Sequence, residues 1–135
     1  MPVCGMLKLG KEERITSKKQ IELLFSGSGS RSMTVFPLRI VYRFEERQQQ
    51  RPQAQILVSV PKRFFKRAVK RNRVKRQIRE AYRRNKGIVL RAMEKEPGKV
   101  VEMAFIWIDQ NLHQSREIEG KMKKMLHRIS ENRWR

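Results

Sequence analysis

The sequence predicts an α/β fold of the α+β two-layer type, in which helices pack on a small mixed sheet in the order α-β-β-α-β-α. Two observations predict it: apolar residues recur at helical spacing in three segments, and they alternate or run unbroken in three others. A chain of 135 residues is enough for one domain. We expect that domain over residues 14–131, between a flexible lead-in (1–13) and a short tail (132–135).

The first helix is expected over residues 18–25. Ser17 fits its N-cap, and Gln20 fits the position from which a side chain reaches back to the N-cap backbone in a capping box. Leu24 and Phe25 belong to the apolar residues that follow at helical spacing. A run of Gly and Ser then ends the helix.

Two strands are expected next, one over residues 33–44 and one over 54–60. In the first, apolar and basic residues alternate, which is typical of a half-buried strand, and Pro37 would lie near its start or on a sheet edge. Apolar residues also alternate in the second strand. Pro61 ends it, because proline cannot donate a hydrogen bond to the ladder.

The longest helical pattern begins near Arg67 and extends toward Met93, and Gly87 is where it would be interrupted. A strand follows over residues 100–108, and its unbroken apolar run predicts a central place in the sheet. The last helix is expected over 114–131. The strands on either side of the long helix are predicted to be parallel, and a right-handed crossover is the default for such a unit.

The composition points to a polyanionic partner. Thirty-three Lys and Arg against thirteen Asp and Glu give a net charge of +20, which suits nucleic acid better than an acidic membrane surface. A single cysteine excludes an internal disulfide, and two distant histidines with a single aspartate, Asp109, argue against zinc and two-metal nuclease sites. Without a long apolar run or a signal peptide, we expect a cytoplasmic protein with no membrane partner.

The charge is concentrated in one segment. Thirteen basic residues lie between Lys62 and Lys86, and Glu80 is the only acid among them. On a helix, five polar residues fall within an arc of about 100°: Asn72, Lys75, Arg76, Arg79 and Arg83. The opposite face is apolar, so the helix would present a cationic strip to a polyphosphate. The competing interpretations are a solvated face that only favours solubility and a helix lying on an anionic membrane.

The same helix carries a family signature. Residues 68–83 read AVKRNRVKRQIREAYR, which closely resembles the hallmark of the bacterial ribonuclease P protein subunit: Ala-Val-x-Arg-Asn-Arg-hydrophobic-Lys-Arg, then an Arg-Glu or Arg-Gln pair and an Ala-aromatic pair. The segment 58–63 resembles the strand end and basic pair before that motif, although Phe64 stands where the family commonly has glycine. The resemblance covers roughly residues 14–130.

The resemblance implies a protein cofactor for a catalytic RNA. That ribonucleoprotein, an endoribonuclease, removes the 5′ leader of precursor tRNA by metal-assisted hydrolysis with water as the nucleophile. It implies no catalytic side chain and no metal held by the protein alone, Mg²⁺ bound in the RNA holoenzyme, and no further protein partner. It also implies a left-handed β-α-β crossover. With Arg83 added from the strip, the residues expected to contact the RNA are Lys62, Arg63, Lys66, Arg67, Arg71, Asn72, Arg73, Lys75, Arg76, Arg79 and Arg83.

The family also has a cleft between its sheet and first helix that holds the single-stranded leader, with aromatic residues as stacking surfaces. By resemblance, Ile21, Phe25 and Tyr42 would line it, with Phe36 as an alternative to Tyr42. Ile21 stands where an aromatic residue is usual and has no π-face to offer. Plain core packing is the other interpretation of Phe25 and Tyr42.

Two other classes of function compete. A ribosomal-type structural RNA-binding protein would explain the size and the charge, but has no reason to match the motif over residues 68–83. A sequence-specific DNA-binding protein would carry more base-reading polar residues on its helix, where Asn72 is nearly alone.

Overall fold

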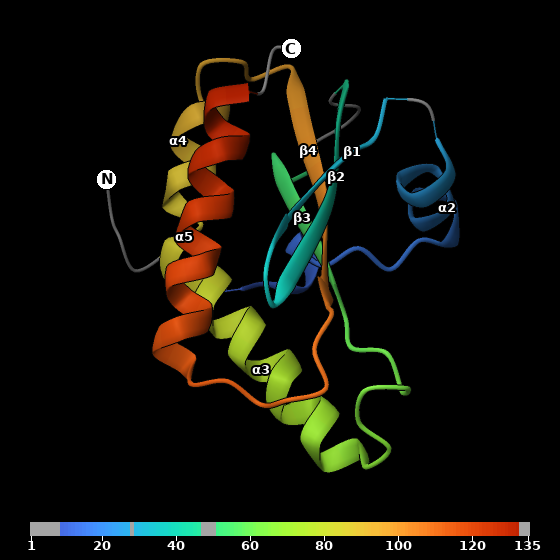
Figure 1. Cartoon of the computed structure of the whole chain (residues 1–135). Coiled ribbons are helices and arrows are strands. Elements are labelled where there is room, and N and C mark those ends of the chain that lie inside the picture. Colours follow the sequence, from blue (N-terminus) through green and yellow to red (C-terminus); the bar gives the residue numbers. More distant parts are fainter. Residues whose placement is uncertain (1–8, 28, 47–50, 133–135) are drawn as a thin grey trace.

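The computed structural model describes residues 9–27, 29–46 and 51–132 (Figure 1). Its elements, in chain order, are η1 (Lys11–Glu13), α2 (Lys18–Ser26), β1 (Arg31–Val35), β2 (Leu38–Glu46), β3 (Ala54–Ser59), α3 (Ala68–Asn85), α4 (Gly87–Met93), β4 (Lys99–Trp107) and α5 (Ser115–Asn132). Apart from the additional strand discussed below, the elements lie close to their predicted positions.

The four strands form one mixed sheet in the order β1-β2-β4-β3. β1 pairs with β2 and β2 with β4 in antiparallel fashion, whereas β3 and β4 are parallel, as predicted for the strands on either side of the long helix. β4 is central, as its unbroken apolar run predicts, because its side chains are buried on both faces. The hand of the crossover stays a prediction.

The prediction of one strand over residues 33–44 is wrong, because this segment is a hairpin. The chain reverses at Phe36 and Pro37, joined by a cis peptide bond, so that Val35 pairs with Leu38. Met33 and Val35 in β1 face the same core as the alternating apolar residues of β2. The core-facing residues therefore change from odd to even positions across the turn, and this phase shift beside Pro37 is the signal in the sequence that a single strand does not explain.

Helices cover both faces of the sheet (Figure 1). The main core lies between the sheet and α3, α4 and α5, and includes the predicted apolar stripes of α3 and α5 together with Trp107. A smaller cluster on the other face joins Ile15 and Leu24 to Val41 and Ala104, so α2 adds a third layer over part of the sheet. Within the described residues, none of the helices is long and apolar enough to cross a bilayer.

The first residues that the structure describes are packed against the domain. Leu9 contacts the main core, and residues Lys11–Glu13 form a single 3₁₀ turn. The amide of Gln55 donates a hydrogen bond of 2.8 Å to the carbonyl of Glu12. Packing against the domain therefore includes residues 9–13, which the sequence places in the lead-in over 1–13. Residues 1–8 and 133–135 lie outside the described part of the chain.

Gln20 does not complete the predicted capping box. Ser17 is the N-cap, and its Oγ accepts a hydrogen bond of 3.4 Å from the backbone N–H of Gln20. The Gln20 side chain points to the sheet instead, where Nε2 donates to Glu102 Oε2 at 2.8 Å and to Gln55 Oε1 at 3.1 Å. Glu102 is a fully buried residue on the central strand. A buried carboxylate without hydrogen-bond donors costs more free energy than an exposed N-cap N–H that can bond to water, so the Gln20 side chain pairs with Glu102.

Burial also changes the acidity of Glu102. Desolvation, and next the negative charge of Glu45, raise the pKa of the Glu102 carboxyl. The hydrogen bond from Gln20 and the charges of Arg51 and Arg43 act in the opposite direction. The hydrogen bond from Gln20 to Glu102 therefore has two effects. It opposes the rise in the pKa of Glu102, and together with the apolar cluster around Leu24 it docks α2 on the sheet.

Candidate nucleic-acid interface

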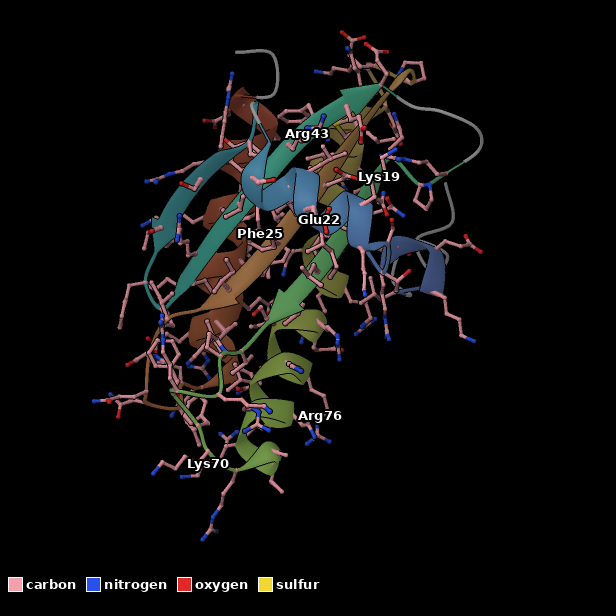
Figure 2. The ribbon with its side chains drawn as sticks, turned by 90° about the vertical axis from the view of Figure 1, so that its right-hand side faces the viewer. Lys19, Glu22, Phe25, Arg43, Lys70 and Arg76 are labelled. Atoms are coloured by element: carbon pink, nitrogen blue, oxygen red, sulfur yellow. The ribbon has the colours of Figure 1, made fainter. Side chains whose placement is uncertain are left out.

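The scaffold of the candidate interface is α3. Its buried face contains Val74, Ile78, Ala81 and Tyr82, as the helical pattern predicts. Because that face is fixed in the core, the opposite face must point outward. The first turns of α3 extend beyond the sheet, and Lys70 and Arg76 project away from the body of the molecule (Figure 2).

The start of α3 favours an anion. The N-cap residue Arg67 makes no side-chain capping bond, and the first turn contains no acidic residue. Helix N-termini have free N–H groups and a partial positive charge, and this one begins beside basic residues instead of the usual acidic ones. A phosphate group would stabilise both the helix end and the cations around it.

The predicted strip forms one continuous surface. A shallow hollow of about 400 Å³ is lined by Val69, Asn72, Lys75, Arg76 and Arg79. Four of these residues belong to the arc inferred from the sequence, so the structure confirms that they share a face. Asn72 is the only neutral polar side chain in this hollow, and it is exposed.

A second and larger hollow, of about 590 Å³, continues from the same face and brings in a residue that the sequence did not indicate. Arg14 lines it together with Arg76, Arg79 and Arg83, although Arg14 is far away in the sequence. Burial, and next the charge of Arg14, lower the pKa of the Arg79 guanidinium. Arg14 is placed there by a parallel bridge between its backbone and Ile56, a long-range pairing for which the sequence contains no signal.

Arg83 is placed on the strip but has a partner within the protein. Its Nε donates a hydrogen bond of 3.0 Å to Glu80 Oε2, and the two side chains also form an ion pair. The hydrogen bond raises the pKa of Arg83 and lowers that of Glu80. The positive charge of Arg83 is therefore balanced locally, unlike that of Arg76, which is exposed and for which no ion pair is found among the described residues.

The loop before α3 has a structural arginine. Arg71 donates from Nη1 to the carbonyls of Phe65, at 2.7 Å, and Lys66, at 2.9 Å, so it closes the loop onto the helix. Phe65, which follows the position where the family commonly has glycine, is buried in the main core. The remaining basic residues of the expected RNA-binding set in and near this loop are exposed: Lys62, Arg63, Lys66, Arg67 and Arg73.

The expected leader-binding residues do not all share a face. Phe25 on α2 is 48% exposed, and Ile21 is half-buried against the apolar cluster under that helix. Tyr42 is only 4% exposed and belongs to the main core on the opposite face of the sheet, where its ring meets Phe44 edge-on. It therefore cannot line a cleft with Phe25. Side chains alternate along β2, so Val41 and not Tyr42 faces α2.

On the α2 side, two features remain for a ligand. Phe25 lies on α2 above the sheet, and Arg43 projects from β2 nearby (Figure 2). Arg43 Nη1 lies 3.6 Å from Glu45 and 3.9 Å from Glu102. Phe36, the alternative to Tyr42, is exposed in the hairpin turn, where its ring centroid is 6.2 Å from that of His113.

His113 fastens the loop between β4 and α5. Its Nε2 lies 2.6 Å from Asp109 Oδ2 and its Nδ1 lies 2.8 Å from Glu117 Oε2, while the ring packs edge-on against Trp107. Its carbonyl accepts a hydrogen bond of 3.0 Å from the side chain of Gln77 on α3. Burial opposes protonation of His113, but the hydrogen bonds and charges of the two carboxylates outweigh it and raise the pKa.

This cluster makes stability depend on pH in a predictable direction. Because the pKa of His113 is raised on folding, its stabilising contribution is complete below the unfolded value of about 6.5 and is lost as the pH rises through the folded value. We expect the free energy of unfolding, measured with urea between pH 6 and 8.5, to fall with pH, and His113→Gln to reduce that slope. The exposed His127→Gln is the control; an unchanged slope in His113→Gln would contradict the assignment.

Metal ligation has no counterpart in the described residues. No three His, Cys, Asp or Glu side chains come together there in a way that could hold a metal ion. The carboxylates around His113 are occupied by hydrogen bonds to its ring.

Known proteins resemble this chain over most of its length. The family described as ribonuclease P matches residues 9–130. A ribonuclease P protein component of Porphyromonas gingivalis is 41% identical over 124 residues, which are 92% of this chain and 88% of that protein. The ribonuclease P protein component of Chlorobaculum tepidum is 36% identical over 104 residues, which are 73% of this chain and 66% of that protein.

Solved structures of RNase P proteins from other bacteria have a similar fold. The RNase P protein from Thermotoga maritima superposes with a TM-score of 0.65 at 21% identity, over 87% of this chain and 97% of that one. The Staphylococcus aureus RNase P protein gives a TM-score of 0.64 at 17% identity, over 87% and 94% of the two chains. The helical motif, the mixed sheet and these matches lead to one conclusion: the chain belongs to the ribonuclease P protein family.

Proposed function

We propose that this protein is the protein component of a ribonuclease P ribonucleoprotein, and that it binds the RNA subunit through the outer face of α3. The observation that carries the proposal is the continuous cationic face formed by Lys75, Arg76 and Arg79, joined by Arg14 from another segment. In this role the protein assists the endonucleolytic removal of the 5′ leader from precursor tRNA. It works in the cytoplasm with the RNA and needs no further protein.

Phosphate recognition explains features that are unfavourable in the free protein. Like charges three or four residues apart destabilise a helix by a few tenths of a kcal/mol per pair, and the strip contains several such pairs. A phosphate backbone turns this repulsion into attraction and releases condensed counterions. Arginine suits the purpose better than lysine because its planar fork can make two hydrogen bonds to one phosphate.

The leader of the precursor tRNA is proposed to contact the α2 side of the sheet. Phe25 offers an exposed aromatic face for stacking on a base, and Ile21 offers apolar contact beside it. Figure 2 shows Phe25 on α2 and Arg76 on α3 in the same view. We expect one RNA assembly to contact both.

The cationic face does not fit a divalent metal ion. Its one carboxylate among the described residues, Glu80, is bonded to Arg83. Mg²⁺ prefers oxygen ligands and would be repelled by the surrounding guanidinium groups. We therefore assign the Mg²⁺ of the reaction, like the catalysis itself, to the RNA.

Reconstitution tests the proposal. The protein is mixed with the ribonuclease P RNA of Porphyromonas gingivalis at low Mg²⁺ concentration, where the RNA alone is slow, and leader removal from a precursor tRNA is followed. We expect strong stimulation, with affinity for the RNA falling steeply as salt rises. Tight binding to structured RNA without stimulation of this or any related ribonuclease P RNA would favour a ribosomal-type structural role instead.

A further inference from the structure

A buried ion pair joins the N-terminal segment to the C-terminal end of α3. Lys86, between α3 and α4, is 2% exposed, and its Nζ donates to both carboxylate oxygens of Glu13 at 2.9 Å. The Glu13 side chain is 18% exposed, so this pair is largely removed from water. Burying a charged amine costs free energy unless a partner with good geometry compensates. The Glu13 carboxylate is such a partner, because both of its oxygens lie at the same short distance from Lys86 Nζ.

The contacts on either side of Glu13 fix the backbone in the same place. The carbonyl of Glu12 accepts the hydrogen bond from Gln55, and the N–H of Ile15 donates to the carbonyl of Ile56 at 2.8 Å. Arg14 lies between these anchors. Its backbone is bridged to β3, while its side chain lines the larger hollow opposite the arginines of α3.

The position of Arg14 is electrostatically unfavourable in the free protein. Its guanidinium is close enough to disfavour the charged form of Arg79, and two other arginines line the same hollow. The Lys86–Glu13 pair adds a side-chain anchor, directly before Arg14, to the backbone hydrogen bonds of Glu12 and Ile15, and it opposes a shift of Arg14 away from this cluster. An anion bound among the guanidinium groups would reverse the sign of the interaction.

We infer that Lys86 and Glu13 are positioning residues for RNA recognition: their buried ion pair holds Arg14 beside Arg76 and Arg79, so that arginines from two chain segments meet one stretch of phosphodiester backbone. This inference rests on the proposed function. It adds that the RNA-binding surface depends on a residue pair that RNA does not touch.

The test is a double-mutant cycle that measures RNA affinity and thermal unfolding of the full chain. Arg14→Ala is expected to weaken binding to the Porphyromonas gingivalis ribonuclease P RNA about tenfold and to reduce the salt slope by about one. Lys86→Met is expected to give a similar loss of affinity. In the Arg14→Ala background, Lys86→Met should cost no further affinity while still lowering the melting temperature.

Lys99→Met is the matched control. Lys99 also pairs with a glutamate, Glu46, but on the exposed end of the sheet, so its loss should leave the RNA affinity unchanged. If Lys86→Met does not unfold cooperatively, Glu13→Gln replaces it, because the amide oxygen keeps a hydrogen bond to Lys86 and only the charge is lost.

The outcomes separate this inference from the proposed function. A lower melting temperature in Lys86→Met with wild-type affinity and salt slope would make the pair purely structural and overturn the inference. Additive losses in the double variant would overturn it too, because the pair would then not act through Arg14. If the wild-type protein does not bind the RNA, the proposed function is wrong, and the inference that rests on it is wrong as well.

Discussion

Arg76→Glu combined with Arg79→Glu is expected to weaken binding to ribonuclease P RNA on the order of 100-fold, the largest effect that we predict. Both side chains line the two hollows of the cationic face, so the double reversal removes two phosphate contacts and adds repulsion in their place. The slope of affinity against salt should fall by about two. Affinity is measured by titration at several salt concentrations, beside a thermal melt.

The fold should survive this change. Neither residue belongs to the buried face of α3, and a carboxylate at position 79 would meet Arg14 as an opposite charge instead of a like one. The control is Lys123→Glu combined with Lys124→Glu, which makes the same change of net charge on exposed positions of α5. Equal losses in both double variants would mean that only the net charge matters, and wild-type affinity in the first would exclude α3 as the interface.

Phe25→Ala is expected to weaken binding of leader-bearing precursor tRNA to the reconstituted holoenzyme about tenfold, because stacking of one base on an aromatic ring is worth ~1–3 kcal/mol. Binding of mature tRNA, which has no leader, should be unchanged. The ring is half in solvent, so its removal should cost little stability. The measurement is the ratio of the two dissociation constants at fixed Mg²⁺ concentration.

Leu23→Ala provides the comparison on the same helix. Leu23 is 36% exposed and lies two residues from Phe25, which places it on another side of α2. Its loss should leave the ratio of the dissociation constants at the wild-type value. Should Phe25→Ala weaken both RNAs equally and lower the melting temperature, Phe25 would be a packing residue and the leader would bind elsewhere.

Local patterns were sufficient for most elements of the fold. The break at Gly87, the N-cap at Ser17 and the central place of β4 each follow from residues close together in the sequence, and the structure confirms all three. The prediction of one strand over 33–44 overlooked a signal that the sequence does contain, since the core-facing residues change from odd to even positions at Phe36 and Pro37. The side chain of Gln20 was misassigned because its partner, Glu102, is remote in sequence.

The same division applies to the candidate site. By itself the sequence determined that one face of the long helix is cationic and the other apolar, because the helical period decides which residues share a face. Only the tertiary structure decided that Arg14 joins that face and that Tyr42 lies in the main core. These placements depend on strand register and on contacts between distant segments, which a periodic pattern within one element cannot encode.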